Sequence, residues 1–190
     1  MTVLSLAPAR KLLAAAALLA LAASAGASAL STRTTTPTQD YFVPNGDFEC
    51  GLTPWIVQIP DTAASYSIAA PGHTSNNSFQ VRFTAPARSP QLGVSARIIS
   101  APVAVVPNAP YQLTFWTYFD NRNAGFIGVM FNNVACYTID ATDHGFGGDF
   151  TLNTVNYTPT NNTVTIKFEF LFGSVTSLDR IDSVTFAPVQ

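Results

Sequence analysis

The sequence predicts an all-β fold, a sandwich or a barrel built from many short strands. Three observations support this prediction. Apolar and polar residues alternate at a period of two in several segments, and Gly, Pro and Asn interrupt these segments at short intervals. Beyond the first forty residues, no segment has a convincing helical period. A repeat of about 20–50 residues is also lacking, which argues against a propeller or a solenoid.

Residues 1–29 have the pattern of a secretory signal peptide. Arg10 and Lys11 precede the apolar run LLAAAALLALAA, and small residues follow it. Three overlapping A-x-A frames offer cleavage sites, and we favour cleavage after Ala29. The alternative is a membrane anchor, but the apolar run is shorter than the roughly 20 residues that a spanning helix needs. We therefore expect a secreted, extracellular protein without a membrane partner.

Residues 30–40 are polar and Thr-rich, which indicates a flexible lead-in to one domain over 41–190. Cleavage of the signal peptide leaves 7 basic and 11 acidic residues, a formal charge of −4. Basic residues do not cluster, which argues against nucleic acid as a partner. Charged residues are few, and Asn, Thr and Ser are abundant. Such a surface suits neutral polar ligands, and we expect a monomer.

The alternating segments also predict which side chains form the core. The clearest segments are 78–84, 109–120 and 163–172, and shorter candidates cover 55–59, 64–69, 91–99, 102–106, 126–131, 134–139, 149–157 and 180–187. The expected core residues of the three clear segments are Phe79, Val81, Phe83, Tyr111, Leu113, Phe115, Phe119, Val164, Ile166, Phe168, Phe170 and Phe172. We expect Trp55 to point into the core as well.

Covalent modification is predicted at two kinds of residue. Cys50 and Cys136 are the two cysteines of the chain, and an isolated pair in an oxidising compartment predicts a disulfide. The alternative is two buried thiols. The sequons NNS, NYT and NNT predict glycan acceptors at Asn76, Asn156 and Asn161 if the chain follows a eukaryotic secretory route.

Three motifs resemble those of a known family. NGDFECGLTPW, APYQLTFWTY and LDRIDSVTFAPV occur in the order and spacing of the cenC-type carbohydrate-binding modules (family 4/9-like) of the galactose-binding-domain-like superfamily. The resemblance spans about residues 41–188. It implies a jelly-roll β-sandwich whose first and last strands lie close together, in a fungal-type secreted protein with a single module. It further implies a non-catalytic function, the binding of a glucan- or xylan-like polysaccharide.

The same resemblance implies a structural calcium ion beside the first and last strands. The acidic positions of its two motifs correspond to Glu49 and Asp182, while Ser183 stands where the family has a second acid. Asp47 adds another oxygen source, and Asp179 is a further acid nearby. Calcium takes six to eight oxygen ligands, some of which backbone carbonyls supply. The alternative is that Asp47 shapes a turn and Asp182 faces solvent.

Two aromatic residues in the middle segment point away from the expected core. If Phe115 and Phe119 face inward, Trp116 and Tyr118 lie on the opposite face of the strand. Aromatic rings stack on the apolar face of a pyranose, while amide and charged groups pair with its hydroxyls. The sequence therefore predicts a sugar-binding platform at Trp116 and Tyr118. The alternative is that a loop packs over this face.

Polar residues are expected to complete the platform, provided that their strands share one sheet with Trp116. The expected members are Gln80 and Arg82 on one strand, Lys167 and Glu169 on another, and Asp120, Asn121 and Arg122 directly after Tyr118. The glycine-rich segment DHGFGGDF at 143–150 is placed to fold over the same face. It does not predict a phosphate site, because no strand-to-helix context surrounds it.

Catalysis is not predicted by these residues. A glycosidase needs an acid and a second carboxylate across a cleft, and nothing marks Glu169 and Asp140 as partners. The chain also lacks the G-x-S-x-G motif of serine hydrolases. Three hypotheses therefore stand in this order: a polysaccharide-binding module, a secreted structural or adhesion protein, and a glycoside hydrolase.

Overall fold

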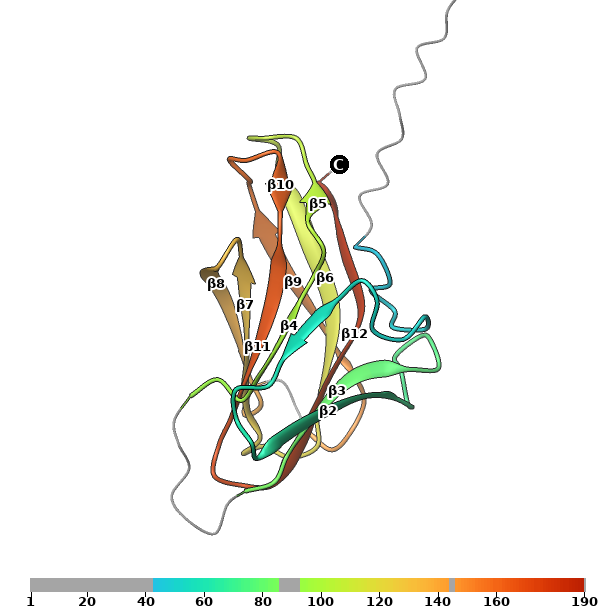
Figure 1. Cartoon of the computed structure of the whole chain (residues 1–190), viewed down its shortest axis with the longest axis vertical. Coiled ribbons are helices and arrows are strands. Elements are labelled where there is room, and N and C mark those ends of the chain that lie inside the picture. The colour runs from blue at the N-terminus through green and yellow to red at the C-terminus, as the bar shows by residue number, and fades with distance from the viewer. Residues whose placement is uncertain (1–42, 86–92, 144–145, 190) are drawn as a thin grey trace, which may run out of the picture. The chain divides into compact units, whose positions relative to one another are not determined.

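The computed structural model describes residues 43–85, 93–143 and 146–189, so the predicted signal peptide and lead-in lie outside the described residues. The described part of the chain forms twelve strands (Figure 1). It contains no helix of the length and apolar character that a membrane span requires. The strands are β1 Ile56–Gln58, β2 Ala64–Ala69, β3 Ser78–Phe83, β4 Ala96–Ile99, β5 Val103–Ala104, β6 Tyr111–Phe119, β7 Gly125–Phe131, β8 Val134–Asp140, β9 Thr151–Tyr157, β10 Thr163–Val164, β11 Ile166–Phe172 and β12 Ser177–Pro188.

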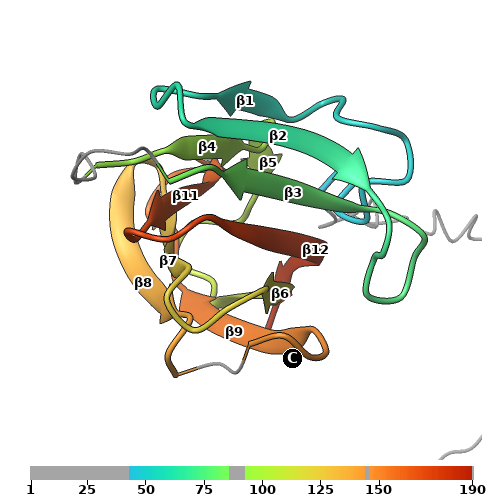
Figure 2. The ribbon, with the colours of Figure 1, turned by 90° about the horizontal axis from the view of Figure 1, so that it is seen from below.

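Two antiparallel sheets of five strands each enclose the core (Figures 1 and 2). The first sheet has the order β1-β4-β11-β7-β8, and the second has the order β2-β3-β12-β6-β9. A short third sheet pairs β10 with β5. Because sequence neighbours such as β6 and β7 lie in different sheets, the chain crosses between the layers repeatedly. The predicted jelly-roll β-sandwich is therefore confirmed.

The inward faces of the strands are those that the alternation predicts. All of the expected core residues on β3, β6, β10 and β11 are buried, and so is Trp55. Across the two sheets, the rings of Phe115 and Phe168 meet edge to face with their centroids 4.9 Å apart. Complete burial of one such side chain stabilises the fold by about 1.5–3 kcal/mol. The alternation of apolar and polar residues thus correctly predicts which side chains of these strands form the hydrophobic core.

The segment 163–172 is two strands rather than the one that was predicted. Its ladder is interrupted at Thr165, whose backbone N–H donates to the side-chain oxygen of Asn132 at 2.9 Å. The next N–H, of Ile166, donates to the hydroxyl of Ser100 at 2.9 Å. Side chains thus replace backbone partners at this point, and the chain passes from the short sheet to the first large sheet.

The start of the described chain lies along the last strand. The N–H of Val184 on β12 donates to the carbonyl oxygen of Gly46 at 2.8 Å. A Cβ atom on Gly46 would collide with the carbonyl oxygen of Val184, so only glycine fits here. This turn, rather than the first strand, contacts the last strand, because β1 lies in the other sheet and pairs with β4.

The predicted disulfide between Cys50 and Cys136 is wrong, because both residues are free cysteines. Cys50 lies in the loop before β1, where its N–H donates to Asn45 Oδ1 at 3.0 Å, while Cys136 lies on β8, an edge strand of the first sheet. The alternative of buried thiols is wrong too, since both residues are exposed.

Candidate functional site

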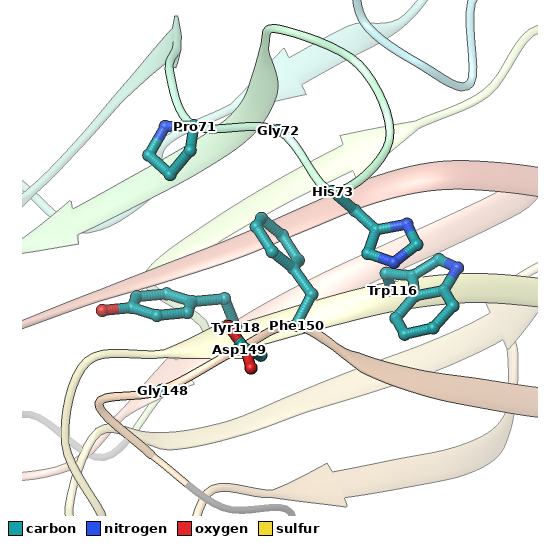
Figure 3. A pocket seen from close by; sticks show the side chains of 8 residues that line it. All are labelled: Pro71, Gly72, His73, Trp116, Tyr118, Gly148, Asp149 and Phe150. Carbon is teal, nitrogen blue, oxygen red and sulfur yellow. The ribbon is translucent and has the colours of Figure 1, made fainter.

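An open cleft of about 490 Å³ lies on the outer face of the second sheet (Figure 3). Its floor is formed by Trp116 and Tyr118 of β6, the two residues that the sequence predicts to point away from the core. Two loops form its walls, and the residues that these contribute are Pro71, Gly72, His73, Gly148, Asp149 and Phe150. The glycine-rich loop therefore borders the predicted platform, as expected, although residues 144 and 145 are outside the described part.

The aromatic side chains in the cleft contact one another. His73 lies flat on Trp116, with ring centroids 3.5 Å apart and an interplanar angle of 15°. Phe150 of one wall has its ring centroid 5.8 Å from that of Tyr118 in the floor and 5.9 Å from that of His73 in the other wall (Figure 3). One face of Trp116 is thus covered by a loop residue, as the alternative to a bare platform anticipates. Tyr118 and Phe150 remain partly exposed.

Gln80 and Arg82 lie in the same sheet as the platform, but β12 separates their strand from β6. Arg180 of β12 therefore occupies the place between Gln80 and Tyr118, with which it pairs in register. Its guanidinium carbon lies 5.9 Å from the centre of the Tyr118 ring. Arg180 is not among the residues predicted for the platform, although its position next to apolar Ile181 was a signal that it points outward.

Arg180 connects the end of β2 to the cleft through hydrogen bonds. Its Nη1 atom donates to the carbonyl oxygens of Ala69 and Pro71 at 3.2 and 3.0 Å, and lies 3.2 Å from the hydroxyl of Ser78. Burial lowers the pKa of Arg180, while the negative potential of Tyr118 opposes that effect. We conclude that Arg180 fixes the position of the wall that begins at Pro71.

The assignment of Lys167 and Glu169 to the platform is wrong. Both lie on β11, in the first sheet, on the other side of the core. There the Oε1 atom of Glu169 accepts from Arg97 Nε at 2.8 Å and lies 3.2 Å from Lys167 Nζ. Parity is a property of each strand alone, so it does not reveal which sheet a strand joins.

Asp120 and Asn121 lie at the end of β6 but do not line the cleft. The side-chain amide of Asn121 donates to Asp120 Oδ1 at 2.9 Å, and the N–H of Gly147 donates to the Phe119 carbonyl at 2.9 Å. These contacts shape the loop that carries Phe150. A ligand-binding role for Asp120 and Asn121 stays a prediction.

The predicted calcium residues converge on the loop 72–77, which forms one wall of the cleft. Asp182 is buried, and its Oδ2 atom accepts from the N–H of His73 at 2.6 Å. Glu49 Oε1 accepts from the N–H of Asn77 at 2.6 Å. Asp47 contributes its backbone carbonyl, which lies 3.3 Å from Ser75 Oγ, while its carboxylate is turned to Glu49 N at 3.4 Å.

The hydroxyl of Ser75 lies among three other oxygens: the carbonyl oxygens of Asp47 and Asn77, and Asp182 Oδ2. We call these three and Ser75 Oγ the oxygen cluster. The distances from Ser75 Oγ to the other three are 3.3, 3.1 and 3.3 Å. One hydroxyl has one proton, so it can point at only one of these acceptors at a time. The described residues hold no group of three or more His, Cys, Asp or Glu side chains suited to a metal. The cluster nevertheless fits a hard cation, because calcium takes carboxylate and backbone carbonyl oxygens, and the cluster offers one carboxylate and two carbonyls.

The carboxyl group of Asp182 is buried. Burial raises the pKa of Asp182, although hydrogen bonds from the backbone of His73 and Ser183 and from the Ser75 hydroxyl act to lower it. A cation in the cluster would favour the ionised carboxylate. Asp179, the further acid considered for the site, instead faces the core, and neither of its carboxylate oxygens has a hydrogen-bond partner in the described structure.

The three sequons lie at the surface. Asn76 belongs to the wall loop, Asn156 to the edge strand β9 and Asn161 to the loop before β10, and all three are exposed. Asn156 Oδ1 accepts a hydrogen bond from Gln112 Nε2 at 3.1 Å. These positions are accessible to a glycosylating enzyme, and glycosylation stays a prediction.

Comparison with known proteins shows the fold. No protein-family model and no curated protein sequence matches this chain. Among solved structures, TmCBM61 in complex with β-1,4-galactotriose aligns with a TM-score of 0.52 and 16% identity, over 79% of this chain and 99% of that one. A family 16 carbohydrate-binding module aligns with 0.51 and 18%, over 76% and 98%.

A third similar structure is an adhesin domain. The K3 cleaved adhesin domain of Lys-gingipain from Porphyromonas gingivalis W83 aligns with a TM-score of 0.57 and 18% identity, over 76% of this chain and 96% of that domain. At such identities the likeness is one of architecture. The chain therefore has the β-sandwich fold of carbohydrate-binding modules and of this adhesin domain.

Proposed function

We propose that this chain is a secreted, non-catalytic carbohydrate-binding module and that the cleft on the second sheet holds the sugar. The observation that carries the proposal is the meeting of Trp116, Tyr118 and Phe150 in one open cleft. The volume lies within the usual range of small-ligand sites, roughly 300–1,000 Å³. The similar structures support it, since TmCBM61 was solved with a galactotriose and others are carbohydrate-binding modules.

The partly exposed rings provide the apolar contact. A pyranose stacked on Tyr118 or Phe150 buries its C–H face against a rigid ring, which costs little side-chain entropy. The polar groups at hand for its hydroxyls are the phenol of Tyr118 and the carboxylate of Asp149, which is exposed at the rim. Trp116 supports the floor from below His73. Binding thus uses stacking for affinity and a few polar contacts for orientation.

The proposal includes a structural calcium ion in the oxygen cluster. Asp182, Ser75 and the carbonyls of Asp47 and Asn77 would hold it, with Glu49 fixing the loop from outside through Asn77. The ion supplies positive charge that neutralises the buried carboxylate and draws the carbonyl oxygens together. It has no part in any reaction.

Catalysis is not proposed for this cleft. Glycosidases of the common types use two carboxyl groups on either side of the scissile bond. Among the eight residues that line the cleft, Asp149 is the one carboxylic acid. The cleft therefore supports binding better than hydrolysis.

Retention on insoluble polysaccharides tests the proposal. The full secreted chain is incubated with glucan, xylan, mannan, galactan and chitin, and its Tyr118→Ala variant is compared. We expect retention on at least one polysaccharide and a loss of about tenfold in affinity for the variant, because an aromatic stack contributes about 0.5–1.5 kcal/mol beyond the area that it buries. Tyr137→Ala is the matched control, because Tyr137 is an exposed tyrosine on β8 of the other sheet. Lack of retention on all five polymers would refute the proposal.

Adhesion to a protein is the second candidate, and the likeness to the gingipain adhesin domain favours it. Exposed apolar residues on β7 and β8 offer a surface for it, namely Phe126, Val134 and Tyr137. The same two tyrosine variants separate the candidates. The result that favours adhesion is binding to a protein partner that is lost in Tyr137→Ala and kept in Tyr118→Ala. Adhesion through the first sheet would then replace sugar binding in the cleft.

A further inference from the structure

We propose that the oxygen cluster and the cleft are coupled, so that calcium in the cluster strengthens sugar binding in the cleft. The loop 72–77 is the connecting element, because it contributes Ser75 and Asn77 to the cluster and His73 to the cleft wall. This inference rests on the proposed function, and it adds regulation of the sugar site by a cation.

The first link is Asp182, which serves both sites. Its Oδ2 atom belongs to the cluster, 3.3 Å from Ser75 Oγ, and also accepts from the N–H of His73 at 2.6 Å. Asp182 pairs in register with Trp116 on the adjacent strand. A change in the position of its carboxylate therefore acts directly on the backbone of His73.

The second link is the stack of His73 on Trp116. The rings are 3.5 Å apart and nearly parallel, and Nδ1 of His73 is buried without a hydrogen-bond partner among the described residues. No side-chain hydrogen bond through Nδ1 anchors the ring independently of the backbone. Where the backbone of His73 lies thus decides how the imidazole covers the indole.

The third link is the tight closure of the loop. The N–H of Gly72 donates to the carbonyl of Asn76 at 3.0 Å. A Cβ atom on Gly72 would lie 2.5 Å from Asn77 O, 2.7 Å from Ser75 O and 2.9 Å from Asp182 Oδ2, so there is no slack inside the loop. A shift of Ser75 or Asn77 therefore acts on Gly72, the residue before His73.

Charge gives the direction of the coupling. Three acceptor oxygens, one of them on a carboxylate, surround a single hydroxyl, and they repel one another when no cation lies between them. A bound calcium removes that repulsion and holds the loop closed, with His73 on Trp116 and the wall of the cleft in place. Sugar then meets a preformed cleft, which lowers the ordering cost of binding.

Calcium alone tests the loop, without any sugar. The signals of the His73 ring protons, assigned by their loss in His73→Ala, report the ring current of Trp116. We expect calcium at millimolar concentration to shift these signals in the full chain and a chelator to reverse the shift. Ser75→Ala should abolish most of the shift. Thr74→Ala is the matched control and should retain it, because Thr74 Oγ1 contacts Ser183 Oγ and lies outside the cluster. Signals that do not respond to calcium overturn the inference.

Titration calorimetry with β-1,4-galactotriose and xylohexaose completes the test. We expect calcium to tighten oligosaccharide binding at least fivefold, and the sugar to tighten calcium binding by the same factor, because coupling is reciprocal. An equal Kd with and without calcium overturns the coupling and leaves the proposed function standing. If calcium shifts the His73 signals but no sugar binds, the proposed function fails, and the coupling to sugar fails with it.

Discussion

His73 covers one face of Trp116, with 3.5 Å between the ring centroids and 15° between the ring planes. A stack of this kind is worth about 0.5–1.5 kcal/mol beyond the area that it buries. We predict that His73→Ala lowers the free energy of unfolding by about 1 kcal/mol and makes Trp116 more accessible to solvent. Urea denaturation measures the first effect, and quenching of tryptophan fluorescence by acrylamide measures the second.

The second tryptophan provides the control for that experiment. Trp55 is buried in the core, where it packs against Phe48 with centroids 5.5 Å apart, so His73→Ala should leave its signal unchanged. In a Trp116→Phe background the substitution should therefore have no effect on quenching. An increase in quenching that persists in that background would mean that His73 does not shield Trp116.

Asp149 should make the cleft selective for uncharged sugars. It is the one charged residue among those that line the cleft, and it is exposed at the rim. We predict that neutral oligosaccharides bind more tightly than uronic acid oligosaccharides of equal length, and that Asp149→Asn narrows the difference severalfold. Calorimetry at low and high salt measures this effect, which salt should weaken. Equal affinities of the wild-type chain for both sugars would contradict the prediction.

Local and long-range features differ in how far the sequence predicts them. The alternation identifies the inward residues of β3, β6 and β11, because successive side chains of a strand point to opposite faces wherever the strand lies. It does not identify neighbours across a sheet. β12 comes last in the chain yet lies between β3 and β6, so it brings Arg180 beside Tyr118, while Lys167 belongs to the other layer.

The alternation of apolar and polar residues does not predict which loop residues belong to the site. His73 and Phe150 line the cleft because Asp182 holds one loop and Phe119 holds the other, through contacts between distant parts of the chain. The disulfide prediction failed for the same reason, since periodicity does not give the distance between Cys50 in a loop and Cys136 on β8. The resemblance to a family predicts more, because it implies that Glu49 and Asp182 lie near each other. In the structure both accept hydrogen bonds from the loop 72–77.

Asp179 should destabilise the fold at neutral pH. Burial raises its pKa well above the usual value of 3.8, and the charge of Asp120 acts in the same direction. The folded state therefore favours the protonated acid, so its contribution is most favourable below pH 3.8 and is lost progressively as the pH rises toward the folded-state pKa. We predict that Asp179→Asn is more stable than the wild type at pH 7, with the gain shrinking towards pH 4.

Urea denaturation between pH 4 and pH 7 measures the effect of Asp179. Asp149→Asn is the control, because it removes an exposed acid and should change stability by less than about 0.5 kcal/mol. A wild type that is more stable than Asp179→Asn at pH 7 would show that the buried carboxylate has a partner in solution, such as a bound cation.

Glu169 should contribute to stability with the opposite dependence on pH. Burial acts to raise its pKa, but hydrogen bonds from Arg97 and Lys167 outweigh that effect and lower it below the usual 4.5. Its contribution is therefore present above pH 4.5 and is lost as the pH falls through the lowered value. Because the side chains of Arg97 and Glu169 are 32% and 16% exposed, we predict that Glu169→Gln costs about 1 kcal/mol at pH 7.

A double-mutant cycle isolates the ion pair of Glu169. Glu169→Gln leaves Arg97 and Lys167 side by side without their shared carboxylate, so part of its cost is repulsion between the two cations. Adding Arg97→Gln should relieve that repulsion, and the double variant should be more stable than the sum of the single costs implies. The coupling should weaken at high salt and vanish at low pH, where the carboxyl is protonated in wild type. Additive costs at pH 7 would mean that solvent already screens the pair.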